Sequence, residues 1–243
     1  MISLNRVIMV RKVGLKDMKK GKVIVIEGAC DGIGKTTQYQ LLKKQLKNDG
    51  KEVVCHHFPS YGTYQAMAVE KYLNGDFGSV ETLSPYFVNS LYATDRAITW
   101  YSELEKEYEQ GKTILLDRYT TSSLIYQAAS FATNEEKKAF IDYIIDFEYN
   151  KIGLPKPDVV IFLTAPFTLA MKMKQQRKEN EGLENDIHER NLDFMQKVYD
   201  NACFVADYLE WEKIVCNKDD EMRSIKDIHQ EVYQLVKKNK MVK

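Results

Sequence analysis

A short run of small and polar residues, GACDGIGKTT at positions 28–37, has the composition of a turn that holds phosphate groups. Glycine adopts backbone conformations that other residues avoid, so successive N–H groups of such a turn can curl around phosphate oxygens. The side chain of Lys35 can reach the β- and γ-phosphates of a nucleotide, and the hydroxyl of Thr36 can bind Mg²⁺. The run therefore predicts a nucleotide site that includes a metal ion.

The spacing of this run departs from the usual phosphate-binding pattern, in which four residues separate the first glycine from the Gly-Lys pair. Counted from Gly28, the run is one residue too long, so the pattern fits only if Ala29 takes the first position. We assign nucleotide binding to the residues from that position onward, and an empty glycine-rich turn is the alternative interpretation. The assigned residues are Ala29, Asp31, Gly32, Ile33, Gly34, Lys35, Thr36 and Thr37.

An acidic residue, Asp117, ends the apolar segment TILLD further along the chain. In proteins with the phosphate-binding turn, an aspartate in this position holds Mg²⁺ directly or through water. Many strands end in aspartate, so Asp117 indicates a metal site only in combination with the phosphate-binding turn. The sequence predicts Thr36 and Asp117 as the metal-binding pair.

Apolar β-branched segments alternate with segments of helical periodicity, which is typical of a parallel sheet with helices on both faces. Strands are expected at residues 23–27, 52–56, 113–117, 158–163 and 213–216. Helices are expected at residues 36–47, 66–73, 84–110, 122–131, 134–148, 192–209 and 225–236, and another begins near residue 165. The turn joins the first strand to the first helix, so the expected fold is α/β, a three-layer P-loop NTPase fold with a five-stranded parallel sheet.

Two segments stand outside this alternation. Residues 1–21 are rich in lysine and arginine and are interpreted as an N-terminal extension, either a transit peptide or a stretch upstream of a start at Met18. Residues 174–190 are dense in charge and lack a periodic apolar face, which favours a lid over the nucleotide. Residues 22–243 are expected to form a single domain that carries this lid.

The composition gives the chain no net charge. Lysine plus arginine and aspartate plus glutamate number 35 each, so nothing global points to nucleic acid or to a membrane surface as a partner. No apolar run approaches the roughly 18 residues that a membrane helix requires. The four cysteines have no zinc-ligand spacing, and this pattern is typical of a reduced, cytoplasmic protein.

Five ordered motifs resemble those of thymidylate kinases, a family of P-loop nucleoside-monophosphate kinases. They read EGACDGIGKTTQ at 27–38, FPSYGT at 58–63, DR at 95–96, DRYTTSSLIYQ at 117–127 and GLPKPD at 153–158, and the resemblance runs from Lys22 to Val236. It implies transfer of the γ-phosphoryl group of ATP to dTMP with Mg²⁺, giving ADP and dTDP for dTTP synthesis. It also implies a homodimer that forms through the long helices after the second strand.

The resemblance implies a role for each residue of the acceptor site. Asp31 is expected to accept a hydrogen bond from the 3′-hydroxyl of the sugar, Arg96 to contact thymine O4, and Arg118 to bind the dTMP phosphate. Tyr92 would stack on the pyrimidine, and Tyr126 would crowd the 2′ position of the sugar. The full expected set is Asp31, Phe58, Pro59, Tyr61, Tyr92, Arg96, Arg118, Ser122, Ser123, Tyr126 and Gln127.

These assignments have ordinary structural alternatives. Asp31 could cap the loop backbone, Tyr92 could pack in the core, and Arg118 could pair with the aspartate before it. The chain also departs from the family at two positions. Ser123 stands where many relatives have a longer polar residue facing the base. Ser60 stands where many have Arg or Asn, so one phosphate contact is either missing or taken over by the neighbouring Tyr61.

Catalysis of phosphoryl transfer depends mainly on positioning and on positive charge at the moving group. Lys35, Arg118 and Asp31 are the catalytic residues expected at the two substrates. The phosphate-binding loop contains no arginine. In that case the family resemblance implies an arginine from the lid, and Arg177 is the candidate.

Three other functions fit parts of the sequence. The NKDD sequence at residues 217–220 matches a base-reading motif of GTPases, but no D-x-x-G sequence follows the third strand. A kinase for UMP/CMP, or for a deoxynucleoside such as thymidine, would share the fold and the loop. A nucleotide-binding protein without catalysis is the third alternative.

Overall fold

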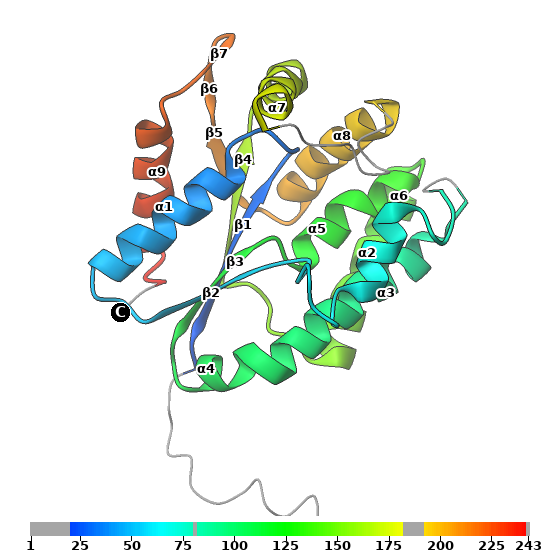
Figure 1. Cartoon of the computed structure of the whole chain (residues 1–243), viewed down its shortest axis with the longest axis horizontal. Coiled ribbons are helices and arrows are strands. Elements are labelled where there is room, and N and C mark those ends of the chain that lie inside the picture. Colours follow the sequence, from blue (N-terminus) through cyan, green and yellow to red (C-terminus); the bar gives the residue numbers. More distant parts are fainter. Residues whose placement is uncertain (1–19, 80–81, 182–191, 242–243) are drawn as a thin grey trace, which may run out of the picture.

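The computed structural model describes residues 20–79, 82–181 and 192–241 of the chain. Its centre is a parallel sheet of five strands in the order β2-β3-β1-β4-β5 (Figure 1). The strands are β1 (Lys22–Gly28), β2 (Val53–His57), β3 (Thr113–Asp117), β4 (Val159–Thr164) and β5 (Glu212–Val215). Each begins and ends within one residue of the strand expected from the sequence. The predicted α/β fold is confirmed.

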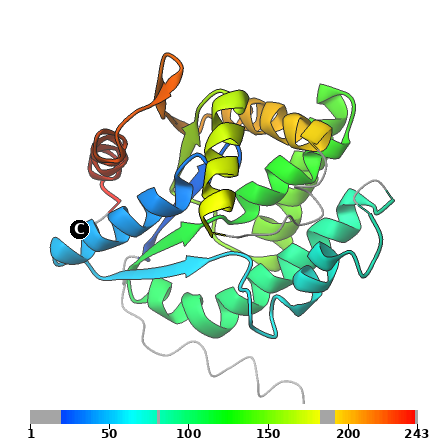
Figure 2. The same ribbon diagram turned by 45° about the horizontal axis from the view of Figure 1, so that its top comes forward.

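Alternate residues of β1 enter two different cores, which explains why this strand is apolar along its length. Ile24 and Ile26 belong to the core that also contains side chains of α1 (Lys35–Asn48) and α9 (Ile225–Lys238). Val23 and Val25 belong to a second core, together with Trp100. Helices α1 and α9 pack side by side against the sheet (Figure 2). A parallel sheet that is covered on both faces requires such continuous apolar strands.

The remaining elements connect these strands. The helices are α2 (Met67–Asn74), α3 (Pro85–Thr99), α4 (Glu105–Glu109), α5 (Thr120–Tyr126), the short η3 (Ala128–Ser130), α6 (Asn134–Ile145), α7 (Phe167–Glu181) and α8 (Leu192–Tyr208). Beyond the main sheet, β6 (Asn217–Lys218) and β7 (Glu221–Met222) form a hairpin. The NKDD sequence lies in this hairpin, where the Asn217 amide donates a hydrogen bond to the carbonyl of Asp219.

Two of the expected helices contain π-helical turns that the periodicity did not predict. The helix expected at 84–110 consists of α3, a π-helical segment η2 (Trp100–Leu104) and α4. The helix expected at 134–148 continues beyond α6 as the π-helical segment η4 (Asp146–Ile152). Such turns are rare in proteins overall, and those that do occur are often found at functional sites. Segment η4 contains the fully buried Glu148, which contacts the site described below.

Parts of the expected N-terminal extension and lid lie outside the described residues, which exclude 1–19 and 182–191. Arg177 belongs to α7, but the position of its side chain is outside the description. The domain boundary expected near residue 22 stays a prediction. Among the described helices, none has both the length and the apolar character needed to cross a membrane.

Candidate active site

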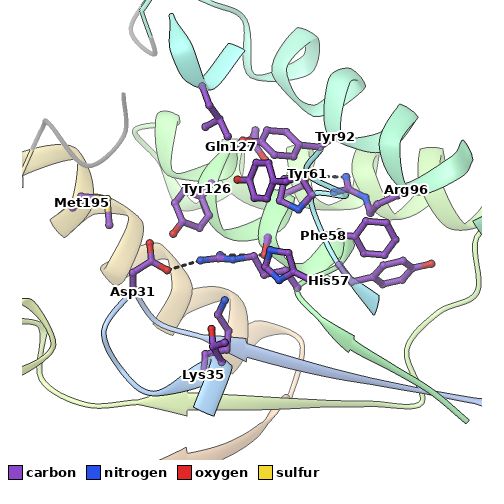
Figure 3. A pocket seen from close by; sticks show the side chains of 17 residues that line it. Asp31, Lys35, His57, Phe58, Tyr61, Tyr92, Arg96, Tyr126, Gln127 and Met195 are labelled. Carbon is purple, nitrogen blue, oxygen red and sulfur yellow. Dashed lines mark hydrogen bonds and ion pairs between the residues drawn. The ribbon is translucent and has the colours of Figure 1, made fainter. Parts of the chain in front are cut away.

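A cavity of about 250 Å³ lies at the carboxyl ends of β1, β2 and β3 (Figure 3). All the residues that the resemblance assigns to dTMP line this cavity, and so do Lys35 and Thr36 of the phosphate-binding loop. The topology explains the gathering, because the carboxyl ends of parallel strands meet at one edge of the sheet. Residues expected to bind the phosphoryl donor and the acceptor therefore adjoin the same space.

The phosphate-binding loop has the backbone conformation that its glycines predict. Gly32 and Gly34 adopt the left-handed region, with φ of 88° and 91°. A Cβ built on Gly34 would meet no atom within 4 Å, so the backbone there faces open space. Ala29 is not among the residues with positive φ, and its N–H donates to the carbonyl of Leu163. An alanine therefore suits the first position, where the usual pattern has glycine.

Helix α7 packs against this loop at Gly32. A Cβ built on Gly32 would lie 2.7 Å from the carbonyl oxygen of Ala170 and 2.9 Å from the Cβ of Lys174. Burial acts to raise the pKa of the Asp31 carboxyl, but the charges of Arg118, Lys35 and Lys174 outweigh it and hold that pKa below its ordinary value. The first turns of α7 thus bring positive charge to the loop.

Lys35 and Asp117 form a buried pair beneath the loop. Nζ of Lys35 lies 3.0 Å from Oδ1 of Asp117, and Nδ1 of His57 lies 3.1 Å from Oδ2 of the same carboxylate. Burial acts to raise the pKa of Asp117. A hydrogen bond from His57 and the charges of Lys35 and Arg118 oppose it and hold the pKa well below its ordinary value. Asp117 is therefore ionised at neutral pH.

These groups fit a magnesium ion bound together with a nucleotide. The Thr36 hydroxyl is exposed at the cavity, and Oδ1 of Asp117 is buried without a hydrogen bond from any described residue. The described residues contain no cluster of three or more His, Cys, Asp or Glu side chains that could hold a metal. Mg²⁺ is usually held by one or two protein oxygens with phosphates and water, so such a cluster is not required.

Arg118 brings positive charge to the cavity. It has a left-handed backbone with φ of 66°, which is uncommon for a residue with a side chain. Its Nη2 lies 2.5 Å from Oδ1 of Asp31, and its guanidinium lies 5.5 Å from the ring centre of Tyr126. The alternative interpretation predicted that Arg118 forms an ion pair. This is confirmed, but the predicted partner, the preceding Asp117, is wrong. Among the described residues, the carboxylates that pair with Arg118 are those of Asp31 and, at 3.8 Å, Glu27.

Glu27 supports this arrangement from below. It is fully buried and accepts hydrogen bonds from the hydroxyls of Thr121 and Ser122 at 2.9 and 2.6 Å. Ser122 in turn lies 3.5 Å from Nη1 of Arg118. The last charged residue of β1 thus fixes the start of α5 and the arginine before it. No site role was predicted for Glu27, because nothing in its local sequence identifies its partners.

Arg96 enters the cavity wall from α3 with its charge already paired. Its Nε and Nη2 donate to the two carboxylate oxygens of Glu148 at 2.7 and 2.6 Å, and Nη2 also donates to the hydroxyl of Ser123. Thr120 donates to the same carboxylate. The hydroxyl of Ser123 therefore orients Arg96, which explains how a short side chain is accommodated where the family often has a longer one.

The remaining walls are aromatic and apolar. Tyr92 and Tyr126 both line the cavity (Figure 3). Tyr92 also packs edge-on against Tyr72, so its core-packing and ligand-facing interpretations both apply. Gln127 is buried, and its Oε1 has no hydrogen-bond partner among the described residues. A buried acceptor in a cavity wall marks a place where a ligand can donate a hydrogen bond.

The Phe-Pro loop after β2 explains the departure at Ser60. Ser60 is buried, its N–H donates to Asp95, and its hydroxyl bonds to Thr99 and His56. It therefore fixes the loop and does not face the cavity. Tyr61 lines the cavity, and more than half of its side chain is exposed.

The structure adds four lining residues that the sequence did not assign. They are His57, Leu73, Tyr119 and Met195. Tyr119 lies inside a quoted motif, and its hydroxyl donates to the carbonyl of Pro155. The other three have no local signal, because their positions depend on how β2, α2 and α8 pack around the cavity.

Comparison with known proteins identifies a single family. The family model for thymidylate kinase matches residues 26–232. A thymidylate kinase from Plasmodium falciparum is 30% identical over 227 residues, which cover 93% of this chain and 94% of the relative. One from Mycobacterium tuberculosis is 31% identical over 179 residues, which cover 72% and 81%. A solved thymidylate kinase structure from Candida albicans superposes with a TM-score of 0.69 at 24% identity, covering 91% of this chain and 93% of that one. This last similarity concerns the fold.

Proposed function

The chain belongs to the thymidylate kinase family, and on this basis, together with the chemistry of its cavity, we propose that it transfers the γ-phosphoryl group of ATP to dTMP. The products are ADP and dTDP, which supplies dTTP synthesis. The choice of acceptor rests on two polar side chains that line the cavity, those of Gln127 and Arg96, which we expect to contact the base.

Gln127 contributes an acceptor and Arg96 a donor to the wall of the cavity. Oε1 of Gln127 is a buried acceptor without a described partner. The described bonds of Arg96 involve Nε and Nη2, which leaves the donors of Nη1 for a ligand. Thymine presents an N3–H donor beside the O4 acceptor, whereas cytosine presents an N4–H₂ donor where thymine has O4. The wall therefore favours a thymine or uracil base over cytosine.

The cavity also offers charge for a phosphate. We expect the dTMP phosphate to replace Asp31 as the ion-pair partner of Arg118. The carboxylate of Asp31 then accepts a hydrogen bond from the 3′-hydroxyl of the sugar. Lys35 would reach the β- and γ-phosphates of ATP along the glycine-lined loop. Tyr126 would crowd the 2′ position and favour deoxyribose.

The reaction needs little covalent chemistry from the protein, because phosphoryl transfer depends on alignment and on charge that is placed in advance. Lys35 and Arg118 supply that charge, while Asp31 fixes the sugar. Mg²⁺, held by Thr36 and Asp117, would neutralise charge on the ATP phosphates. We propose Arg177, which belongs to α7, as the further cation, because the phosphate-binding loop contains no arginine.

The role of Arg177 can be tested against its neighbours on α7. Arg177→Ala is expected to lower kcat by about 10²-fold, the scale of losing one electrostatic contact to the moving group. Lys172→Ala removes a charge from an exposed position on the same helix and serves as the control. Near-normal kcat with unchanged KM for ATP in Arg177→Ala would reject the assignment.

We also propose that the protein is a homodimer that forms through α3. Phe87, Leu91, Thr94 and Ile98 follow one another at spacings of four and three residues on this helix, and Phe87 and Thr94 are exposed while Leu91 and Ile98 are half-buried. Such a stripe lies on one face and suits packing against another helix. Light scattering should give twice the chain mass, and Leu91→Glu with Ile98→Glu should give the monomer. A monomeric wild type would refute the proposal.

The location proposed is the cytoplasm. All four cysteines are free, which is consistent with a reducing compartment.

A panel of phosphate acceptors tests the proposed activity. With ATP and Mg²⁺, dTMP should give the highest kcat/KM among dTMP, dUMP, UMP, CMP and thymidine. The Gln127→Leu variant should lose more activity on dTMP, dUMP and UMP than on CMP, because it removes the acceptor for N3–H, which cytosine lacks. Preference for CMP or thymidine over dTMP would assign the chain to another kinase class, and no ADP release with any acceptor would reject catalysis.

A further inference from the structure

His57 and Asp117 occupy paired positions at the ends of neighbouring strands. In the parallel register of β2 and β3, His57 lies opposite Asp117. The Asp117 side chain is only 2% exposed, whereas that of His57 is 43% exposed and lines the cavity. The imidazole, which is drawn at the cavity in Figure 3, is thus in contact with a buried carboxylate behind it.

The two oxygens of Asp117 have different surroundings. Oδ2 is contacted by Nδ1 of His57 at 3.1 Å. Oδ1 lies 3.0 Å from Nζ of Lys35 but receives no hydrogen bond from any described residue. A carboxylate is a pure acceptor when ionised, so the ring nitrogen that contacts Oδ2 must be the N–H donor. This contact restrains the rotation of the carboxylate.

The pair with Lys35 is the contact that ATP binding would weaken. Lys35 begins α1 directly after the glycine-lined loop, and the triphosphate expected there competes for the same ammonium group. A buried carboxylate that loses its charge partner is costly unless other groups hold it. Among the described residues, His57 is the side chain besides Lys35 that forms an ion pair with Asp117.

We propose that His57 is a positioning residue, which holds Oδ2 of Asp117 so that Oδ1 stays available to the metal when Lys35 turns to the nucleotide. This inference rests on the proposed function. Hydrogen-bond partners behind a metal ligand orient it, and their loss typically costs about 10- to 100-fold in metal affinity or activity. His57 belongs to no motif of the chain, and only the pairing of β2 with β3 brings it to the site.

Three substitutions separate positioning from simple packing. Asn at position 57 can place an amide N–H where Nδ1 lies, Gln places it further out near the position of Nε2, and Ala removes it. His229→Asn, on α9, is the matched control for loss of a histidine elsewhere. The primary readout is Mn²⁺ binding to the enzyme with ADP, followed by electron paramagnetic resonance. Thermal unfolding of each variant, and kcat and KM for dTMP, are measured in parallel.

We expect His57→Ala and His57→Gln to weaken Mn²⁺ binding by about 10-fold or more, in line with other partners of metal ligands. His57→Asn should restore most of the affinity, and His229→Asn should match the wild type. KM for dTMP should change much less than metal affinity. If His57→Ala fails to fold, the comparison of His57→Asn with His57→Gln still tests the proposal.

Unchanged Mn²⁺ binding in His57→Ala would overturn the inference. So would equal losses in the Asn and Gln variants, or a change confined to KM for dTMP, which would place the imidazole at the acceptor. If the wild type binds Mn²⁺ with ADP but phosphorylates no dTMP, the proposed function fails while the comparison of variants still tests His57. A wild type that binds no Mn²⁺ with ADP would overturn both.

Discussion

Arg118 and Asp31 form an ion pair across the cavity, with 2.5 Å between Nη2 of the arginine and Oδ1 of the aspartate. The two residues follow β3 and β1, which are neighbours in the sheet although far apart in the chain. Both are expected to bind dTMP, Arg118 through the phosphate and Asp31 through the sugar. The pair therefore keeps the two groups in place before substrate arrives, and the substrate must separate them.

Replacement of Arg118 should affect the acceptor step strongly. Arg118→Met is expected to lower kcat/KM for dTMP by roughly 10²- to 10³-fold, the scale of losing one electrostatic contact to the reacting group. Arg118→Lys should recover little, because an ammonium lacks the planar fork that binds two oxygens. Steady-state kinetics measure both. Arg223→Met, which removes an arginine paired with Glu231, is the control, and an equal loss there would contradict the prediction.

Replacement of Gly32 should disturb the loop through α7. Gly32→Ala adds a Cβ at a φ of 88° and 2.7 Å from the carbonyl of Ala170, so the loop and the helix must move apart. Gly50→Ala has similar backbone strain, at a φ of 71°, but meets no atom within 4 Å. Strain alone costs of order 1 kcal/mol. We expect Gly50→Ala to lose about that much stability and keep its activity, whereas Gly32→Ala should also lose ATP binding, as measured by calorimetry. Normal ATP affinity in Gly32→Ala would show that α7 does not set the loop.

The sequence predicted the elements of this site better than the contacts between them. Local patterns predicted the loop at residues 28–37, the acidic Asp117 and the motifs after β2 and β3. Each of them lies at the end of a strand, and the apolar residues of that strand predict it. The partners of these residues come from distant segments. Glu148, which holds Arg96, lies in a π-helical segment that apolar periodicity did not indicate. His57 reaches Asp117 only through strand pairing, and α7 meets Gly32 only through tertiary packing.

The pair of Arg96 and Glu148 should matter more for stability when one partner is removed than when both are. Both side chains are almost fully buried. Glu148→Leu should reduce the free energy of unfolding by about 3 kcal/mol or more, because it leaves a buried guanidinium without its counter-ion. The double variant Arg96→Met with Glu148→Leu should be more stable than Glu148→Leu alone, since an apolar pair can replace a buried ion pair. Urea unfolding measures both.

The same two variants separate the structural role of this pair from base recognition. The double variant should fold yet show a raised KM for dTMP, because Arg96 no longer donates toward the base. Unchanged KM for dTMP would mean that Arg96 only holds η4 in place. Greater instability of the double variant than of Glu148→Leu would contradict the account of the buried pair.

The ionised state of Asp117 should make stability depend on pH in the acid range. The folded protein holds the pKa of this carboxyl well below its ordinary value of 3.8, because His57, Lys35 and Arg118 outweigh the effect of burial. A depressed folded pKa means that the unfolded chain takes up a proton first as pH falls. The stability that Asp117 contributes is therefore complete above about pH 5, and it declines as the pH falls below the ordinary pKa toward the folded pKa.

Urea unfolding of wild type and Asp117→Asn between pH 5 and pH 3 measures the difference. The stability gap between the two proteins should be largest at pH 5 and should narrow toward pH 3. A gap that stays constant or widens over this range would mean that the carboxylate is not stabilised by the positive groups around it.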